Sequence, residues 1–272
     1  MKTISVPLPL ALIQPFDFPR KLGICERLFA HMLAERGICW VQTGAGIPWK
    51  LDLSNRTHRW IVYGKYENTF FLNWARKNLP DNGVIVDSGA NIGQMLVYLA
   101  QYIPQGKVLA FEPGLEQANW LEECLAIHNQ LPVEVIRYGL GADATQKYLQ
   151  NLGDASIHGA WSEVSETEGE PIKIVRLAEE LAERGIQKVD LWKLDVQYYE
   201  IPALEGAKEL LELQQVKALW VELWDNNSLK IREYLAKFGY QCYLFDSRGK
   251  LYSPSPSSFP KRIDGLFLPD NQ

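Results

Sequence analysis

The stretch Val84-Ile85-Val86-Asp87-Ser88-Gly89-Ala90-Asn91-Ile92-Gly93 predicts a buried strand that runs into a tight turn and then a helix. The β-branched residues that open it are typical of a strand covered on both faces. In an open parallel sheet, the loop after such a strand lies at the carboxyl edge, where ligands bind. We expect Gly89 to let this loop approach a ligand closely and Gly93 to let the next helix pack near the strand. The Gly89-x-x-x-Gly93 spacing departs from the Gly-x-Gly-x-x-Gly fingerprint of dinucleotide-binding sheets.

Downstream of this stretch, strands alternate with amphipathic helices. Apolar runs predict strands at 84–86, 108–111, 133–138, 189–194 and 216–223, and helical spacing predicts helices at 94–103, 115–129, 177–184, 202–213 and 229–238. We expect irregular structure between 143 and 173, with one added strand at 147–151. Two closing strands, 241–245 and 263–268, have no helix between them and must be antiparallel. The pattern predicts an α/β fold: a mostly parallel, Rossmann-like sheet with helices on both faces and a C-terminal antiparallel hairpin, similar to the architecture of class I methyltransferases.

The first eighty residues follow a different pattern. They predict a helix at 24–36, a hairpin with its turn at Gly44-Ala45-Gly46 and a strand at 49–53, and a second helix at 67–78. We therefore assign residues 1–80 to an N-terminal helical and hairpin extension, and residues 81–272 to the main domain.

The composition is that of an ordinary folded protein and argues against several functions. The chain has 272 residues, of which 47% are hydrophobic and 22% charged, with a net charge of −5. Because no dense basic run is present, we expect neither a nucleic acid nor a membrane surface as partner. The four cysteines lack C-x-x-C spacing and the four histidines lack metal-ligand spacing, so we expect no metal and a reducing, cytoplasmic location.

A second motif, Phe111-Glu112-Pro113, ends the next predicted strand. An acidic residue at this point can accept hydrogen bonds from both hydroxyls of a ribose, and Pro113 ends the strand. Glycine loops and acidic strand ends are each common in α/β proteins. Together, in a strand–loop–helix–strand context, they indicate a cofactor of the nucleoside type.

These motifs resemble those of the FkbM-type S-adenosylmethionine-dependent methyltransferases, over about residues 49–268. Residues 87–93 are close to the family's Asp-x-Gly-Ala-Asn-x-Gly loop, and residues 111–113 match its ribose-binding strand end. Lys193-Leu194-Asp195-Val196 matches its Lys-Ile-Asp-Val strand end. Glu200, followed by residues 204–207, matches its Glu-x-x-x-Leu-x-Gly-Ala segment, and Trp220-Val221-Glu222 matches the strand that ends in Glu.

The resemblance implies S-adenosylmethionine as the cofactor and names the residues that would bind it. Asp87 and the loop backbone would hold the methionine portion, Glu112 the ribose, and the Gly139-Leu140-Gly141 loop would lie along the adenine. Leu140 is equally well explained as a core residue. The implied cofactor-binding residues are Asp87, Ser88, Gly89, Ala90, Asn91, Gly93, Glu112, Pro113, Leu140 and Asp195.

Two residues are candidates for the catalytic base. Asp195 ends the fourth strand of the sheet at the same edge as Asp87, so we expect it to face the cleft. It would contact the cofactor's amino group, orient the acceptor or take a proton; capping of the next helix is the alternative. His158, in the segment expected to be irregular, is the second candidate, because histidine is the usual base at neutral pH.

One departure from the family pattern concerns the acceptor. Where the family usually has Asp-Val-Glu-Gly, this chain has Asp195-Val196-Gln197-Tyr198, so a carboxylate is replaced by an amide and a glycine by an aromatic ring. The resemblance then implies an altered acceptor pocket, to which the N-terminal extension contributes. The candidate substrate-binding residues are Gln197, Tyr198, Glu222 and Trp224, although plain packing also explains aromatic residues at such positions.

The resemblance predicts methyl transfer to a hydroxyl of a sugar or of a polyketide or peptide natural product. Methylation of an amine or carboxyl group in a small peptide-like product stays open, as does a non-catalytic cofactor-binding module. A nicotinamide-dependent oxidoreductase is disfavoured by the glycine spacing and the terminal hairpin. The partner is thus expected to be a small-molecule or peptide acceptor, and the sequence does not specify an oligomeric state.

Overall fold

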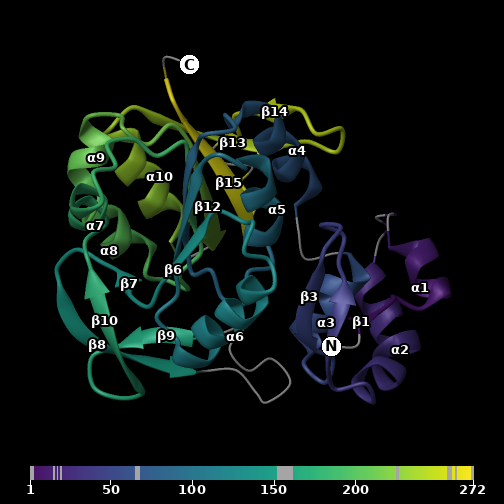
Figure 1. The fold of residues 1–272 in the computed structure, drawn as a ribbon. Coiled ribbons are helices and arrows are strands. Elements are labelled where there is room, and N and C mark those ends of the chain that lie inside the picture. Colours follow the sequence, from purple (N-terminus) through teal and green to yellow (C-terminus); the bar gives the residue numbers. More distant parts are fainter. Residues whose placement is uncertain are drawn as a thin grey trace.

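The structure is a computed structural model that describes residues 3–14, 16, 18, 20–64, 68–151, 162–224, 227–255, 259–260 and 262–270. The strand at the start of the glycine loop is β4 (Val84–Ser88), inside an eight-stranded sheet with the order β14-β13-β15-β12-β11-β4-β5-β6 (Figure 1). The other strands of this sheet are β5 (Lys107–Phe111), β6 (Val133–Ile136), β11 (Leu191–Leu194), β12 (Leu219–Trp224), β13 (Tyr240–Phe245), β14 (Leu251–Tyr252) and β15 (Arg262–Pro269).

The strand directions confirm the predicted architecture. Strands β6, β5, β4, β11 and β12 run parallel to one another. Strand β15 is antiparallel to both β12 and β13, between which it lies. The sheet is therefore mostly parallel and is closed by antiparallel strands, as in the class I methyltransferase fold.

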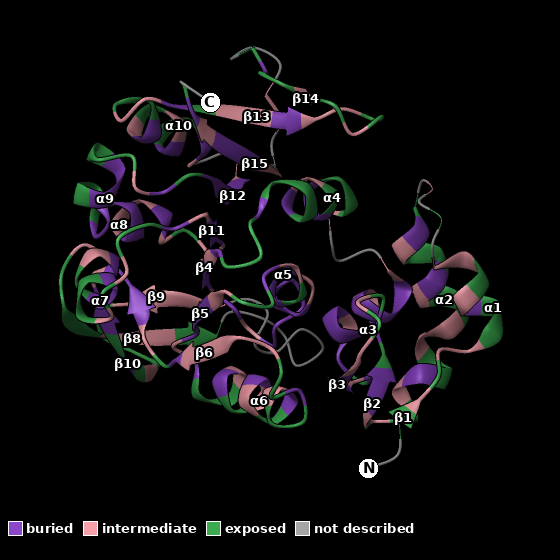
Figure 2. Cartoon of the chain, turned by 45° about the horizontal axis from the view of Figure 1, so that its top comes forward, coloured by how far each residue is buried: buried purple, intermediate pink, exposed green. Residues whose placement is uncertain are grey.

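Helices cover both faces of the large sheet (Figure 2). Because side chains alternate along a strand, Ile85 belongs to the core beneath α4, α5 and α6, and Val86 to the core beneath α7, α8, α9 and α10. On the first face Phe71 of α4 stacks on Trp220 of β12 with ring centroids 4.0 Å apart. The helices are α4 (Thr69–Asn78), α5 (Leu96–Tyr102), α6 (Leu115–Ala126), α7 (Leu177–Glu183), α8 (Glu200–Glu205), α9 (Lys208–Glu212) and α10 (Ser228–Ala236).

The segment expected to be irregular contains a second sheet, which corrects that prediction. Its order is β7-β10-β8-β9, with β7 (Gly139–Leu140), β8 (Thr145–Asn151), β9 (Ser162–Ser165) and β10 (Glu170–Val175). The added strand predicted at 147–151 is part of β8. Strand β10 interrupts its buried residues Ile172, Ile174 and Val175 with Lys173, so it lacks the continuous apolar run that marks the core strands of the large sheet.

The helix predicted at 202–213 is two short helices, α8 and α9, which meet at Gly206 and Ala207. A Cβ atom on Gly206 would lie 2.0 Å from the carbonyl oxygen of Gly141. The break therefore lies where the chain passes directly against the loop that follows β7.

The N-terminal residues form a smaller unit beside α5 and α6 (Figure 1). It comprises β1 (Thr3–Ile4), α1 (Leu8–Ile13), α2 (Lys21–Ala34), β2 (Ile38–Gln42), β3 (Pro48–Asp52) and α3 (Arg56–Tyr63). The predicted hairpin is confirmed, since β2 and β3 pair antiparallel across the glycine turn. Helix α3 was not predicted: its first residues are polar, and its start depends on the Asn55 side chain, which accepts the Thr57 N–H at 2.9 Å.

Within these units, no helix of the described residues is long and apolar enough to cross a membrane.

Candidate active site

The carboxyl ends of β4, β5 and β11 open into a cleft that the second sheet borders on one side. From the large sheet and its loops, the lining residues are Ser88, Gly89, Asn91, Gln94, Phe111, Glu112, Pro113, Asp195, Val196, Gln197 and Tyr199. The remaining lining residues are Gln117 of α6 and Tyr138, Gly139, Leu140, Leu149, Ser162, Val164 and Ile174 in or next to the second sheet.

The loop at residues 89–93 is fixed by contacts with the protein backbone. Gly89 has a φ of +72°, and a Cβ atom there would lie 1.9 Å from the carbonyl oxygen of Asp195. The amides of Gly89 and Ala90 both donate to the carbonyl of Phe111, at 3.0 and 3.1 Å. The structure thus adds a second reason for a glycine at this position of the cleft lining: it lets the loop cross the end of β11.

Gly93, with a φ of +83°, has a different role from the expected one. A Cβ atom on Gly93 would meet Leu121 of α6 at 2.7 Å and Trp49 of β3 at 2.8 Å. The close packing at Gly93 is therefore between the loop, α6 and the N-terminal unit, and not between α5 and the strand.

Glu112 is a buried carboxylate at the end of β5, 6% exposed. One oxygen accepts the Asn91 amide at 2.7 Å and the other accepts the Gly114 amide at 2.9 Å. Burial raises the pKa of Glu112 to about 7, and these two amides oppose the rise. Each oxygen keeps a second lone pair, so the carboxylate can accept further hydrogen bonds from a ligand.

A buried ammonium group connects the strand ends beneath the cleft. Lys193 Nζ donates to Asp87 Oδ1 at 3.0 Å and to the Gly89 carbonyl at 3.3 Å, and lies 3.6 Å from Asp195 Oδ2. Burial raises the pKa of Asp87 and Lys193 opposes that rise. Among the described residues, none hydrogen-bonds to the other oxygen, Asp87 Oδ2. Asp87 therefore lies below the described lining of the cleft and orients the loop through Lys193.

Gln197 joins two carboxylates at the mouth of the cleft. Its side-chain amide donates to Asp195 Oδ1 at 3.2 Å and to Glu222 Oε2 at 3.3 Å. A glutamate at this position would instead place three carboxylates together. The replacement relative to the family pattern thus lowers the negative charge of this corner and orients the Asp195 carboxylate.

Tyr198 continues this corner with an exposed aromatic ring. Gln197 and Tyr198 have φ values of +51° and +70°, a conformation that costs a side-chain-bearing residue about 1–3 kcal/mol. The backbone is held by Glu200, which accepts the Tyr198 amide at 3.2 Å and the Asn227 side-chain amide at 2.8 Å. Burial raises the pKa of Glu200 to about 7. The Tyr198 and Trp224 rings lie 5.6 Å apart, and Tyr198 is 38% exposed.

Most of the predicted site residues come together at this edge. Those that line the cleft are Ser88, Gly89, Asn91, Glu112, Pro113, Leu140, Asp195 and Gln197. Asp87 at the end of β4 and the loop residues Ala90 and Gly93 are not among the described residues that line the cleft. Tyr198, Glu222 and Trp224 adjoin Gln197 beyond the described lining. His158 lies outside the residues that the structure describes.

Several lining residues were not predicted. Gln94 directly follows the glycine loop, so its position in the sequence was a usable signal. Leu149 falls in the strand predicted at 147–151, but nothing in the sequence placed that strand beside the cleft. The lining residues of β9 and β10 had no signal, because those two strands were not predicted.

A comparison with known families matches residues 87–242, more than half of the chain, to a family described as Methyltransferase FkbM domain. The chain belongs to this family. It is therefore an S-adenosylmethionine-dependent methyltransferase, which confirms the resemblance found in the sequence.

Relatives of this FkbM methyltransferase share limited identity with it. Methyltransferase sdnD of Sordaria araneosa is 29% identical over 184 residues, which are 56% of this chain and 71% of that protein. The AMB antimetabolite synthetase AmbE of Pseudomonas aeruginosa is 28% identical over 184 residues, 54% of this chain but only 9% of that much longer protein. Among solved structures, TrmK of M. capricolum, in complex with S-adenosyl-homocysteine, is 12% identical with a TM-score of 0.39, over 75% of this chain and 70% of that one.

The cleft fits S-adenosylmethionine in its chemistry. Glu112 offers carboxylate oxygens for ribose hydroxyls, and the loop backbone offers polar groups beside them. Leu140, Leu149 and Ile174 form an apolar wall suited to a flat base.

Replacing Lys193 with methionine tests the buried charge group. The change leaves Asp87 without its buried partner, so we expect a loss of about 3–5 kcal/mol in the free energy of unfolding. The loss should shrink as the pH is lowered, because a protonated Asp87 buries no charge. Lys217→Met, which removes a half-exposed partner of Asp190, is the matched control and should cost less than about 1 kcal/mol. Equal losses in urea melts of the two variants would contradict the role given to Lys193.

Proposed function

We propose that this enzyme transfers the methyl group of S-adenosylmethionine to a hydroxyl oxygen of a sugar or of a polyketide or peptide natural product. The proposal is carried by one observation: a carboxylate, Asp195, stands on the cleft and is oriented from two sides, by Lys193 and by Gln197. An alcohol must lose its proton during methyl transfer, and a positioned base is what it requires. The name of AmbE, an antimetabolite synthetase, supports an acceptor among natural products.

The arrangement of the cleft supports the following cofactor-binding roles. Glu112 accepts hydrogen bonds from the ribose hydroxyls, the loop at 89–93 holds the methionine portion, and Leu140 lies along the adenine. Asp87 acts from beneath the loop through Lys193. When bound, the cofactor supplies a methyl group on a sulfonium, which is a good leaving group.

Asp195 has the role of base in this proposal. Its carboxylate takes the proton of the acceptor hydroxyl while the hydroxyl oxygen forms a bond to the methyl carbon and the carbon–sulfur bond breaks. A positioned base contributes about 10²–10⁴-fold to such a step. Holding the reacting atoms in line contributes further, because the reaction is then effectively intramolecular. His158 is kept as the second candidate for this role.

The acceptor occupies the corner formed by Gln197, Tyr198, Glu222 and Trp224. The exposed Tyr198 ring beside Trp224 offers an apolar face to a sugar ring or an aromatic group. Glu222 and Asp195 offer acceptors for hydroxyl groups. The strained backbone at Tyr198 supports this role, because strain of this kind gathers at ligand sites.

The acceptor is thus a small molecule or a peptide, and neither nucleic acid nor membrane is part of the proposal. The four cysteines are unpaired in the described structure, which supports a reducing, cytoplasmic setting.

Asp195→Asn tests the reaction directly. With labelled cofactor and a panel of hydroxyl, amine and carboxyl acceptors, we expect the wild type to form methyl ethers. The variant should lose about 10²–10⁴-fold in kcat because the base is removed. Its affinity for S-adenosyl-homocysteine should stay within about threefold. The asparagine can at most exchange one hydrogen bond for a neutral one, and a neutral hydrogen bond contributes only about 1 kcal/mol. If the affinity falls together with kcat, Asp195 binds the cofactor and is not assigned as the base. An unchanged kcat would also exclude Asp195 as the base.

Glu112→Gln tests the ribose contact. With a pKa of about 7, Glu112 is ionised above that pH and protonated below it, and only the ionised form accepts from both hydroxyls. Affinity for S-adenosyl-homocysteine should fall about tenfold from about pH 8 to about pH 6 in the wild type. Glu112→Gln should bind at least about tenfold more weakly at the higher pH, from the loss of charge-assisted hydrogen bonds, and should show a flat pH profile.

Glu200→Gln is the matched control, because the pKa of Glu200 is raised to a similar value but its carboxylate bonds Tyr198 and Asn227. It should keep the pH dependence of the wild type. If calorimetry shows that dependence in Glu112→Gln as well, the ribose contact lies elsewhere.

Tyr198→Gly tests the acceptor corner. Glycine adopts the left-handed conformation without strain, so little stability should be lost. The KM of the acceptor should rise, or the range of acceptors should widen, while cofactor affinity is unchanged, because the ring is proposed to touch the acceptor alone. Tyr252→Ala, which removes an exposed tyrosine from β14, is the control and should change neither the acceptor kinetics nor the cofactor affinity. A lower melting temperature with unchanged acceptor kinetics would assign Tyr198 to packing only.

A further inference from the structure

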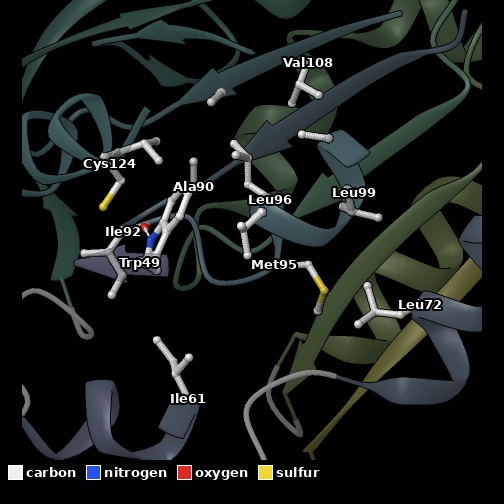
Figure 3. Packing of buried hydrophobic residues seen from close by; sticks show 14 of the residues in the cluster. Trp49, Ile61, Leu72, Ala90, Ile92, Met95, Leu96, Leu99, Val108 and Cys124 are labelled. Carbon is white, nitrogen blue, oxygen red and sulfur yellow. Dashed lines mark hydrogen bonds between the residues drawn. The ribbon is translucent and has the colours of Figure 1, made fainter. Parts of the chain in front are cut away.

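Trp49 of β3 contacts the glycine loop from the N-terminal unit. Its indole N–H donates to the carbonyl of Ile92 at 2.7 Å, and Figure 3 shows the Trp49 ring beside Ile92 within the buried cluster. The side chain is 1% exposed. The next residue, Gly93, lies so close that a Cβ atom on it would be 2.8 Å from the ring. The indole therefore meets two consecutive residues of the loop, one through a hydrogen bond and one through packing.

The opposite end of the loop is held by β5. The amides of Gly89 and Ala90 donate to the Phe111 carbonyl, and the Asn91 amide donates to Glu112 at 2.7 Å. Trp49 then fixes the part of the loop that these bonds do not reach. The loop is thus held at one end by β5 and the Glu112 carboxylate and at the other by Trp49.

Trp49 is itself held against α6. His128 stacks on the indole with ring centroids 5.9 Å apart and an interplanar angle of 9°. The Nε2 of His128 lies 2.7 Å from the carbonyl of Pro48, to which it donates. At the residue that follows Trp49 in the sequence, the carbonyl of Lys50 accepts the indole N–H of Trp120 in α6 at 2.8 Å. The hairpin is thus fixed to α6, the helix that follows the Glu112 strand end.

We propose that Trp49 is a positioning residue for the cofactor site, so that the N-terminal hairpin is a working part of that site. The proposal rests on the proposed binding of S-adenosylmethionine by the loop. Trp49 is not among the described residues that line the cleft; it keeps the Ile92 carbonyl and Gly93 in place, and with them the loop backbone next to Glu112. Trp49 lies outside the family match, which begins at residue 87, whereas its partners in the loop lie inside it.

Trp49→Phe keeps an aromatic ring and removes the N–H. Trp120→Phe is the matched control, because it removes an indole N–H from the same hairpin–α6 contact without touching the loop. We expect Trp49→Phe to raise the Kd of S-adenosyl-homocysteine and the KM of the cofactor about three- to tenfold, the effect of one lost hydrogen bond, with kcat at saturating cofactor nearly unchanged. Trp120→Phe should leave both constants as in the wild type.

Hydrogen exchange gives a readout that needs no cofactor. The Gly93 amide, which donates to the Ala90 carbonyl at 2.8 Å, should exchange faster in Trp49→Phe than in Trp120→Phe. Equal effects of the two variants on affinity and exchange would overturn the proposal, because the hairpin would then act only through general stability.

Glu112→Gln in the same binding assay separates this proposal from the cofactor assignment. If Glu112→Gln weakens binding and Trp49→Phe does not, only the role of Trp49 fails. If neither variant changes the affinity, the cofactor lies elsewhere and both assignments are overturned.

Discussion

The Lys193 ammonium lies at a depth where an unpaired charge would be very costly, and it contacts groups from three directions. Asp87 at the end of β4, the Gly89 carbonyl in the loop and Asp195 at the end of β11 all depend on it. This pairing fixes the ends of two central strands relative to each other. The crossing of Gly89 over Asp195, the orientation of Asp195 toward Gln197 and the shape of the cleft follow from it.

Much of the large sheet could be predicted, because its strands are continuous apolar runs. The helices between them differ from these runs, since their apolar residues recur at helical spacing. Of the second sheet only the strand at 147–151 could be predicted, because β8 and β10 mix polar and apolar residues and pair with each other across a loop that no local pattern shows. The start of α3 depends on the Asn55 cap and on partners such as Glu26, which lies far away in the sequence. The break between α8 and α9 depends on a backbone contact with Gly141, which no local pattern shows.

The candidate site was predictable where its residues follow strands. Glu112 and Asp195 could be placed on the cleft because parallel strands end at one edge, and the structure puts both there. Pairings between side chains were not predictable: Gln197 appeared in the sequence as an altered motif, and only the structure shows that it bridges Asp195 and Glu222. The reasons for Gly89 and Gly93 were likewise hidden, since their neighbours come from β11, α6 and β3.

The contact between Trp49 and Gly93 makes these two positions a size-matched pair. A larger residue at Gly93 leaves no room for the indole, and a smaller residue at Trp49 leaves an empty space behind the loop. Each position therefore limits which substitutions the other can accept during evolution. Exchange of segments between relatives of this protein must carry the N-terminal hairpin and the glycine loop together, although a stretch of more than forty residues separates them along the chain.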